Sequence, residues 1–316
     1  MALIPRNDGD GESMRTAEHR EPQRTLLHIS DTHLRAGGAR LFDLVDGAET
    51  LARTLTMLEG AQIDVDAIVF TGDLADLGQS AAYSELRRIV DPFAARLDAR
   101  VVWVMGNHDD RAAFHAGLFD DPLGGDSTVD RVDDIDGLRI VTLDSTVPGH
   151  HHGEISDSQL EWLEGVLAVP APLGTILTMH HPPIPSVLPL AASVELRDQH
   201  RLAPVLRGSD VRAIIAGHLH YSTFGTFAGI PVSVASSTCY VQDLTVPIGG
   251  SRPQDGARSV NLVRVHDETV VHAVISVEQT PILEHIDAAE ARRRLALAGI
   301  APRTDAEHTE TRVLVA

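Results

Sequence analysis

The chain has 316 residues, of which 43% are hydrophobic, which is enough for one large α/β domain or two ordinary ones. Its formal net charge of −19 argues against a nucleic acid polymer as the main ligand, because such binding requires a basic face. Every basic residue is arginine, which excludes the phosphate-loop, Schiff-base and kinase sites that depend on a lysine.

The first 24 residues are polar and charged without an apolar centre, so we expect a disordered tail at residues 1–24 and no secretory signal. The single cysteine, Cys239, excludes an internal disulfide and fits a reducing compartment. No apolar stretch approaches the length of a membrane span. We therefore expect a cytoplasmic protein whose folded part begins near residue 25.

Short apolar runs rich in valine and isoleucine alternate with segments of helical periodicity. The apolar runs predict buried strands at residues 25–30, 66–70, 100–105, 138–144, 175–179 and 211–216. The periodic segments predict helices at residues 43–59, 80–97, 157–168 and 199–206. We expect N-caps at Ser80 and at either Ser156 or Asp157. This alternation of strands and helices predicts parallel pairing and an α/β fold.

Closely spaced strands without intervening helices follow, around residues 223–236 and 260–277, and predict hairpins. Beyond residue 280 the sequence is less apolar, with a helix predicted near residues 287–298 and a loose end. The expected organisation is therefore a catalytic domain at residues 25–280, followed by a C-terminal helix and tail at residues 281–316.

Side chains that can bind metal ions follow each of the six predicted buried strands. They are Asp31 and His33, Asp73 and Asp76, Asn107 and His108, Asp144 and His150 to His152, His180 and His181, and His218 and His220. Each set alone has a simpler explanation, since GD and GN are common turns and the histidine run would suit a solvated loop. Ligands bind at the carboxyl ends of the strands in open α/β sheets. The occurrence of such a set after every one of the six strands therefore predicts a metal site.

The motifs DTH, GDLAD, GNHDD, HH and GHLH occur in this order, and the order resembles that of the calcineurin-type metallophosphoesterase superfamily. The resemblance covers residues 25 to about 277. The stretches GDLAD, VWVMGNHDDR, VPGHHHGEI, HHPPIPSV and AGHLHYST further resemble the class III cyclic nucleotide phosphodiesterases of mycobacteria. The fold implied by this resemblance is a four-layer α-β-β-α double sandwich of two mixed sheets.

The resemblance also implies two metal ions. The first would be bound by Asp31, His33 and His220, and the second by Asn107, His180 and His218. Asp73 would be the shared ligand, because the two oxygens of a carboxylate can each bind one ion. Four imidazoles among oxygen ligands suit Mn, Fe, Zn or Co better than Mg or Ca. The resemblance favours an iron–manganese pair.

His108 follows the ligand Asn107 and is the candidate general acid, because protonation of a leaving alkoxide contributes about 10²–10⁴-fold. The alternative is that His108 only orients the phosphate as a hydrogen-bond donor. We expect Asp76 to orient His108, and His151 to contact the substrate. Together with Asn107, these residues form the predicted substrate-binding set.

Other conspicuous residues have structural interpretations. His28 lies within a predicted strand and is expected to be a core histidine, and His181 is expected to face away from the metal ions. Glu154 is expected to be structural. Cys239 is interpreted as a small buried residue, because nothing in SSTCYVQD supplies the base that a nucleophilic thiol requires.

The substrate class is indicated by comparison within the superfamily. Its protein serine/threonine phosphatases carry GDxVDRG and GNHE, whereas this chain has GDLADLG, with Leu77 in place of the arginine, and GNHDD. The resemblance therefore implies hydrolysis of 3′,5′-cyclic AMP, with cyclic GMP as a second substrate, by attack of a metal-bridging hydroxide. The alternative is a broader phosphodiesterase acting mainly on 2′,3′-cyclic nucleotides or other diesters. A third hypothesis, a metal-poor scaffold that binds partners, requires ligand losses, and all seven positions are retained.

Two long loops, residues 182–198 and 238–259, flank the predicted site and are rich in proline, glycine and serine. We expect them to line the nucleobase pocket or to form the contact of a homodimer. The sequence EARRRLALAGI near the C-terminus predicts a surface helix packed on the sandwich. The alternative is a basic amphipathic segment that makes a peripheral contact with an anionic membrane.

Overall fold

Residues 15–278 and 280–303 are described by the structure, which is a computed structural model. Two mixed sheets form its centre. The first sheet consists, in spatial order, of β14 (Val270–Ser276), β13 (Ser259–Val265), β2 (Arg24–Ile29), β3 (Ala67–Thr71) and β4 (Arg100–Val104). The second consists of β5 (Arg131–Ile135), β6 (Leu138–Thr142), β7 (Thr175–Thr178), β8 (Val211–Ala216), β10 (Ile230–Val234) and β9 (Thr223–Phe227).

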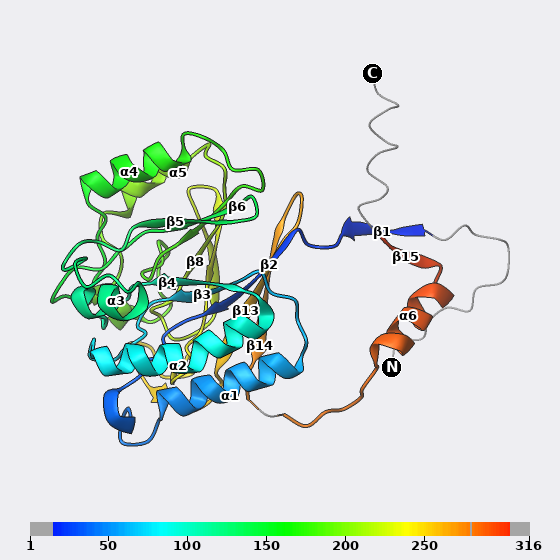
Figure 1. The fold of residues 1–316 in the computed structure, drawn as a ribbon, viewed down its shortest axis with the longest axis horizontal. Helices are drawn as coiled ribbons and strands as arrows, with labels where there is room; N and C mark the ends of the chain where they lie inside the picture. The colour runs from blue at the N-terminus through cyan, green and yellow to red at the C-terminus, as the bar shows by residue number, and fades with distance from the viewer. Residues whose placement is uncertain (1–14, 279, 304–316) are drawn as a thin grey trace.

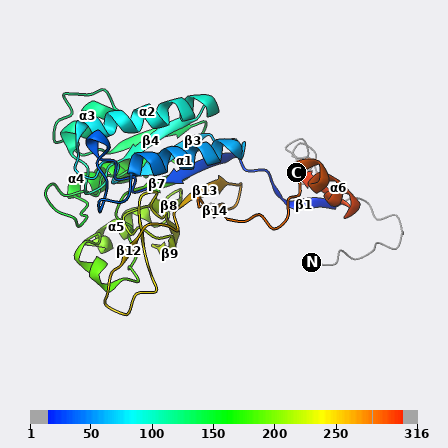
Figure 2. The same cartoon turned by 90° about the horizontal axis from the view of Figure 1, so that it is seen from below.

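Helices cover the outer face of each sheet (Figures 1 and 2). The first sheet is covered by α1 (Gly47–Gly60), α2 (Ser80–Leu97) and α3 (Arg111–Leu118). The second is covered by α4 (Asp157–Leu167) and α5 (Leu202–Leu206), with the 3₁₀ turns η2 (Pro189–Ser193) and η3 (Gln199–Arg201) nearby. The short turn η1 (Ala36–Gly38) precedes α1. The predicted four-layer α-β-β-α sandwich is therefore confirmed.

The alternation of side chains along β2 explains the two sides of the first sheet. Leu27 and Ile29 are buried against the helices, whereas Leu26 is buried against the second sheet. Successive side chains of a strand point to opposite faces, so an uninterrupted apolar run is what a strand buried on both faces requires. This burial places the end of β2, and the polar residues after it, at the edge where the two sheets meet.

The predicted strands and their pairing are confirmed to within a few residues at the boundaries. Strands β2, β3 and β4 pair in parallel, as do β6, β7 and β8. The two predicted hairpins, β9–β10 and β13–β14, are antiparallel. Among the strands of the two sheets and the α-helices that cover them, β5, whose sequence RVDDI is too charged to read as a strand, and the short helix α3 were not predicted.

The two ends of the described chain depart from expectation. Residues Arg15–Arg20, predicted to be disordered, form β1, which pairs in parallel with β15 (Ile300–Arg303). Helix α6 (Ala288–Leu297) occurs where a helix was predicted, but it lies beside this pair and away from the sandwich (Figures 1 and 2). The prediction of a helix packed on the sandwich is therefore wrong. The physical reason is that the two leucines of α6, Leu295 and Leu297, are two positions apart in the sequence. Residues at that spacing do not lie on the same face of a helix, so α6 has no continuous apolar face to pack on the sandwich.

The remaining predictions at the termini, residues 1–14 and 304–316, lie outside the described residues. A further small antiparallel pair, β11 (Val241–Gln242) and β12 (Pro253–Gln254), lies in the predicted loop 238–259. In the described part of the chain, no helix combines the length and apolarity that a membrane crossing requires.

Helix caps provide a stability prediction with an internal control. Ser156 caps α4, accepting a hydrogen bond from the backbone of Gln159 and completing a capping box. Ser80, by contrast, is the first residue of α2, whose N-cap is Gln79 without a side-chain bond, so the predicted cap at Ser80 is wrong. We expect Ser156→Ala to lower the free energy of unfolding by about 1 kcal/mol and Ser80→Ala to change it by much less, as measured by urea denaturation. Equal losses would contradict the capping assignment.

Candidate metal centre

Seven side chains from both sheets converge at the carboxyl ends of five parallel strands. They follow β2 (Asp31, His33), β3 (Asp73), β4 (Asn107), β7 (His180) and β8 (His218, His220). Five of the seven have positive φ angles: Asp31 (51°), His33 (44°), Asp73 (51°), His218 (73°) and His220 (56°). Such angles are uncommon outside glycine and cluster at functional sites, where the surrounding structure maintains them. The left-handed backbone ends each strand abruptly and turns these side chains toward a common point.

A first cluster is formed by Asp31, His33, Asp73 and His220, all of them buried. The Nε2 atoms of His33 and His220 lie 3.2 Å apart. His220 Nε2 also lies 3.2 Å from a carboxylate oxygen of Asp31. His33 Nε2 lies 3.4 Å from Oδ2 of Asp73. The four ligand atoms therefore surround a point at which one ion would contact all of them.

A second cluster lies beside the first and shares Asp73 with it. His180 Nε2 lies 3.4 Å from Asp73 Oδ2, the oxygen that also approaches His33. The same nitrogen lies 3.2 Å from Asn107 Oδ1 and 3.2 Å from His218 Nδ1. Asp73 thus occupies the position expected of a ligand shared by two ions.

The hydrogen bonds on the far side of each imidazole test whether these clusters fit metal ions. Nδ1 of His180 donates to the carbonyl of Thr71 (2.7 Å). Nδ1 of His220 donates to the carbonyl of Tyr240 (3.0 Å), and Nε2 of His218 donates to that of Val194 (2.9 Å). A carbonyl can only accept, so the outer nitrogen of each neutral ring carries the proton.

When the rings are neutral, their inner nitrogens carry lone pairs, and two inner nitrogens face each other at 3.2 Å in each cluster. Facing lone pairs repel unless a cation or a proton lies between them. Outer hydrogen bonds to carbonyl or carboxylate oxygens are the usual second shell of histidines that bind metals. The donor set, two carboxylates, one amide and four imidazoles, therefore fits two transition-metal ions.

The charges of the cluster agree with this interpretation. Burial raises the pKa of Asp31, but His220 and His180 together outweigh burial and lower the value to about 2. Burial likewise raises the pKa of Asp73, but His180 and His33 hold it well below its usual range. Burial lowers the pKa of His218 to about 3. For His180, burial is outweighed by Asp73, which raises the pKa to about 9. For His220, burial is outweighed by Asp31, which raises the pKa well above its usual value. Two ionised carboxylates thus lie among buried imidazoles, an arrangement that attracts a cation.

The predicted substrate-binding residues lie on the open side of the clusters. His108 donates from Nδ1 to the backbone carbonyl of Asp76 (2.9 Å), and its backbone N–H donates to Asp73 (2.8 Å). The carboxylate of Asp76 contacts His33 Nδ1 at 3.2 Å and His108 Nδ1 only at 3.7 Å. Asp76 therefore orients His108 mainly through its backbone oxygen, whereas its carboxylate orients His33. His151 Nδ1 accepts a hydrogen bond from the Asn107 amide (3.0 Å), which fixes the amide oxygen toward His180.

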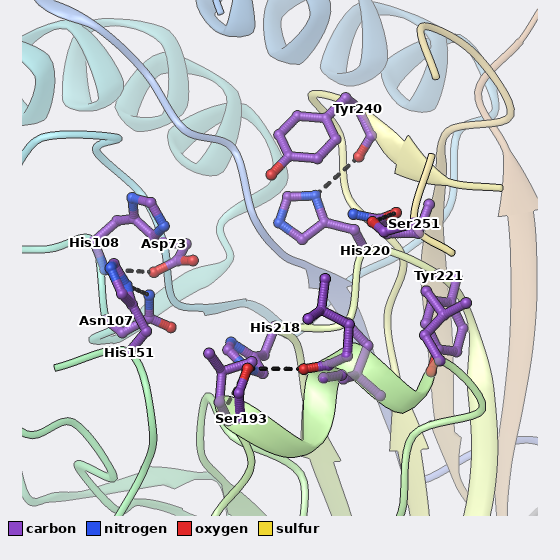
Figure 3. A pocket seen from close by; sticks show the side chains of 16 residues that line it. Asp73, Asn107, His108, His151, Ser193, His218, His220, Tyr221, Tyr240 and Ser251 are labelled. Atoms are coloured by element: carbon purple, nitrogen blue, oxygen red, sulfur yellow. Dashed lines mark hydrogen bonds between the residues drawn. The ribbon is translucent and has the colours of Figure 1, made fainter. Parts of the chain in front are cut away.

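A cavity opens onto these residues (Figure 3). Its volume of about 480 Å³ lies within the range of sites that bind small molecules. One part of its wall is polar and comes from Asp73, Asn107, His108, His151, His218 and His220. The rest comes from η2 and the residues around it, from Tyr221, and from Tyr240 to Ser251 in the second predicted loop. Both loops expected to flank the site therefore line it.

Comparison with known proteins agrees with this geometry. A family model described as "Calcineurin-like phosphoesterase" matches residues 24–222. The chain belongs to this family. A probable cyclic nucleotide phosphodiesterase of Rhodococcus erythropolis is 58% identical over 292 residues, covering 91% of this chain and 95% of the relative. A cAMP/cGMP dual specificity phosphodiesterase of Mycobacterium tuberculosis is 58% identical over 288 residues, covering 91% and 90%.

Among solved structures, a dimetal phosphatase from Danio rerio covers 82% of this chain and 98% of its own, with a TM-score of 0.57 and 17% sequence identity. At that identity the likeness concerns the fold alone. The predicted resemblance to the calcineurin-type phosphoesterases is therefore confirmed, both by sequence and by architecture.

Several histidines and acids near the strand ends of this phosphoesterase lie outside the clusters. Asp144 is buried, accepts from the backbone of Thr146 and pairs with Arg111. His181 is also buried, but its two nitrogens contact Ser145 Oγ (2.8 Å) and the His151 carbonyl (3.1 Å), so neither is available to an ion.

The remaining side chains have the structural character expected of them. His152 pairs with Glu154 at 3.0 Å, and His150 is exposed outside the cavity wall. His28 is fully buried in the core, as predicted, and its Nε2 is bonded to Thr71 Oγ1. Its Nδ1 has no hydrogen-bond partner among the described residues, so the ring is not fully satisfied, as a core histidine is expected to be. Cys239 is fully buried with its sulfur 3.0 Å from Ser237 Oγ, as predicted.

Asp109 is a residue of the phosphoesterase site whose role was not predicted. Its carboxylate accepts hydrogen bonds from the backbone N–H groups of Leu74 (3.1 Å), Ala75 (2.9 Å) and Gly106 (2.9 Å), and from the Tyr83 hydroxyl (2.9 Å). Burial, together with the charge of Asp73, raises its pKa to about 6. Asp109 thus ties the loop that carries Asp73 to the loop that carries Asn107. The signal in the sequence was the first aspartate of the DD pair in GNHDD.

We expect Asp109→Ala to destabilise the fold by about 2–4 kcal/mol, because three backbone donors and one hydroxyl lose their acceptor. Tyr83→Phe removes one of these four bonds, together with the bond that the hydroxyl accepts from the backbone N–H of Asp110 (3.1 Å), and should cost about 1–2 kcal/mol. Thermal unfolding of the two variants beside the wild type measures the difference. An Asp109→Ala variant no less stable than Tyr83→Phe would show that the carboxylate does not hold the loops together.

Proposed function

We propose that this chain is a two-metal phosphodiesterase that hydrolyses 3′,5′-cyclic AMP and cyclic GMP to nucleoside 5′-monophosphates. The observation that carries the proposal is the pair of ligand clusters sharing Asp73 at the end of a cavity large enough for a nucleotide. Identity of 58% to relatives named as cyclic nucleotide phosphodiesterases supports the substrate class. The retained ligands argue against a partner-binding scaffold without catalysis.

The proposed ligands are Asp31, His33 and His220 for one ion, and Asn107, His180 and His218 for the other, with Asp73 between them. Two bound ions would neutralise the phosphoryl charge and lower the pKa of a water molecule that acts as the nucleophile. The bond between Asn107 and His151 holds both side chains at the rim of the cavity, where a phosphoryl oxygen would lie.

His108 is the proposed catalytic acid. Its Nδ1–H is committed to the Asp76 carbonyl, so only Nε2 can exchange a proton with the substrate. The ring lines the cavity, and its backbone is bonded to Asp73, which fixes the ring beside the shared ligand. Asp76 acts as a positioning residue for both His108 and His33.

We propose an iron–manganese pair for the two sites, with Mn, Zn or Co as substitutes. Support comes from the mixture of hard oxygen and borderline imidazole donors in each cluster. Elemental analysis of the purified protein, followed by chelation and reconstitution with one metal at a time, tests this proposal. A purified protein that contains neither iron nor manganese would contradict it.

The function is tested by a hydrolysis panel of 3′,5′- and 2′,3′-cyclic nucleotides and bis(p-nitrophenyl) phosphate, with the metals replaced one at a time. We expect the 3′,5′-cyclic purine nucleotides to give 5′-monophosphates. A kcat/KM for 2′,3′-cyclic nucleotides far above that for the 3′,5′ isomers would favour the broader phosphodiesterase instead. No turnover with any metal would contradict both assignments.

We further propose a cytoplasmic homodimer, consistent with a single buried cysteine and with the unpaired edge strand β14, where Val271 and Val274 are exposed. Light scattering at several protein concentrations measures the mass in solution. A monomer at every concentration would contradict the dimer.

Peripheral membrane contact through the C-terminal segment is a related proposal, supported by the exposed Ile282, Leu283 and Leu297 near three adjacent arginines. We expect truncation after residue 280 to abolish sedimentation with anionic vesicles while turnover of small diesters persists, because α6 lies apart from the cavity. The truncation also removes β15, the partner of β1, so its thermal stability is measured in parallel. A folded, metal-loaded truncation without catalysis would show that the segment reaches the site.

A further inference from the structure

The cavity contains polar groups that the chemistry at the metal clusters does not use. The ligands and His108 lie at one end, and beyond His220 the wall continues to Tyr240 and Ser251 (Figure 3). Gln242, which is hydrogen-bonded to Ser251, also lines the cavity. Leu188, Leu190 and Ala191, in or beside η2, provide apolar surface there. A cyclic nucleotide carries its charge on the phosphate, so the phosphate belongs at the metal end and the base extends toward this second part of the cavity.

Most of the polar groups in this second part are already engaged. The Tyr221 hydroxyl contacts Ser186 Oγ (2.7 Å) and accepts from the backbone of Val187 (3.2 Å). Ser193 donates to the carbonyl of Leu190 (2.8 Å). Tyr240 packs against His220, with ring centroids 4.3 Å apart, and forms an aromatic wall. Among the described residues of this part of the wall, these contacts leave the amide of Gln242 and the hydroxyl of Tyr240 without a protein hydrogen-bond acceptor, and Gln242 is the one whose side chain is oriented by a neighbouring hydrogen bond.

The orientation of that amide is fixed by its neighbour. Ser251 Oγ donates to Gln242 Oε1 at 3.0 Å, so the amide oxygen is occupied. Within the described part of the chain, no hydrogen bond from Gln242 Nε2 to a protein acceptor occurs, so its two N–H groups remain available to a ligand. Ser251 is itself placed by the neighbouring ion pair, in which Arg252 Nε donates to Asp243 at 2.7 Å.

The backbone of Gln242 is tied directly to a metal ligand. Its N–H donates to the carbonyl of His220 (3.0 Å), and His220 Nδ1 donates to the carbonyl of Tyr240 (3.0 Å). The segment from Tyr240 to Gln242 is therefore hydrogen-bonded to both the backbone and the imidazole of His220. This anchoring fixes the distance between the amide and the position of the phosphate, which is what a residue that recognises the base requires.

We propose that Gln242, oriented by Ser251, is a specificity residue that donates a hydrogen bond to a ring-nitrogen acceptor of the purine base. The proposal rests on the cyclic nucleotide phosphodiesterase function proposed above. N7 and N3 are acceptors in both adenine and guanine, whereas the 6-substituent is a donor in adenine and an acceptor in guanine. A donor directed at a shared acceptor therefore binds both purines, and it accounts for acceptance of both cyclic nucleotides at one site.

The test compares Gln242→Met, which keeps the volume and removes the donor, with Gln254→Met as the matched control. Gln254 is exposed on the partner strand β12 and lies outside the cavity wall. Kinetics are measured with cyclic AMP, cyclic GMP and bis(p-nitrophenyl) phosphate, which has no base. We expect Gln242→Met to lower kcat/KM about 3- to 10-fold on both cyclic nucleotides, mainly through KM, and to leave the aryl diester within twofold. Ser251→Ala should give a smaller loss in the same direction.

Each other outcome has a defined meaning. Equal losses on all three substrates would show that Gln242 acts only by supporting His220, and would overturn base recognition. A loss on one cyclic nucleotide alone would overturn the shared acceptor. Behaviour identical to Gln254→Met would remove any role for the side chain. Failure of the wild-type enzyme itself to hydrolyse cyclic nucleotides would instead contradict the proposed function, so the two failures are distinguishable.

Discussion

Replacement of Asp73 by alanine is expected to lower kcat at least about 10³-fold and to reduce bound metal below two ions per chain. Asp73 Oδ2 lies 3.4 Å from an imidazole nitrogen of each cluster, so its loss weakens both sites at once. Stabilisation of transition-state charge by metal ions is worth several kcal/mol, and each 1.36 kcal/mol corresponds to a tenfold rate change. Turnover is measured together with metal content by elemental analysis.

A control is needed because Asp73 has a left-handed backbone (φ 51°), which alanine tolerates poorly. Asp98 has nearly the same angle (φ 52°) but lies exposed between the end of α2 and the start of β4, at the opposite end of that strand from the ligand Asn107. Asp98→Ala should therefore show the cost of the backbone conformation without loss of metal or turnover. Near-wild-type turnover of Asp73→Ala with two ions bound would show that the shared-ligand assignment is wrong.

Replacement of His108 by alanine is expected to separate acid catalysis from metal binding. His108 lines the cavity without belonging to either ligand cluster, so both ions should remain bound. Loss of a general acid should cost about 10²–10⁴-fold on a cyclic nucleotide, whose ribose alkoxide is a poor leaving group. The loss should be far smaller on bis(p-nitrophenyl) phosphate, because p-nitrophenolate leaves without protonation.

His150→Ala is the matched control, since His150 is exposed in the loop next to His151 and does not line the cavity. It should retain turnover on both substrates. Equal losses for His108→Ala on the two diesters would leave His108 as a residue that only orients the phosphate. A fall in metal content would instead place it among the ligands.

The ligand side chains could be predicted because each stands directly after an apolar run that could only be a buried strand. Asp31 and His33 illustrate this, since charged groups at the end of β2 require a partner there. The backbone groups that orient the ligands could not be predicted. The carbonyl of Val194, which fixes His218, lies 24 residues away in the sequence, and any residue type supplies a carbonyl.

The elements missed at the edges have a related explanation. Strand β5 alternates exposed charges with buried Asp133 and Ile135, because it lies at the edge of the second sheet and only one face is covered. The pairing of β1 with β15 joins RTAEHR, which is rich in charge, to IAPR, which is too short to show an apolar pattern. Hydrophobic periodicity reports burial, so elements with little burial leave almost no trace in it.

The position of β2 between β3 and β13 has a consequence for how the protein is made. Strand β2, which Asp31 and His33 follow, leaves the ribosome before its antiparallel neighbour β13, which begins at Ser259. At about 5–20 residues per second, roughly ten to fifty seconds separate the two. During that interval an apolar strand has an open edge, which is a template for aggregation. The segment 24–222 that defines the family lacks β13, so expressed alone it should aggregate even though it contains all seven ligands.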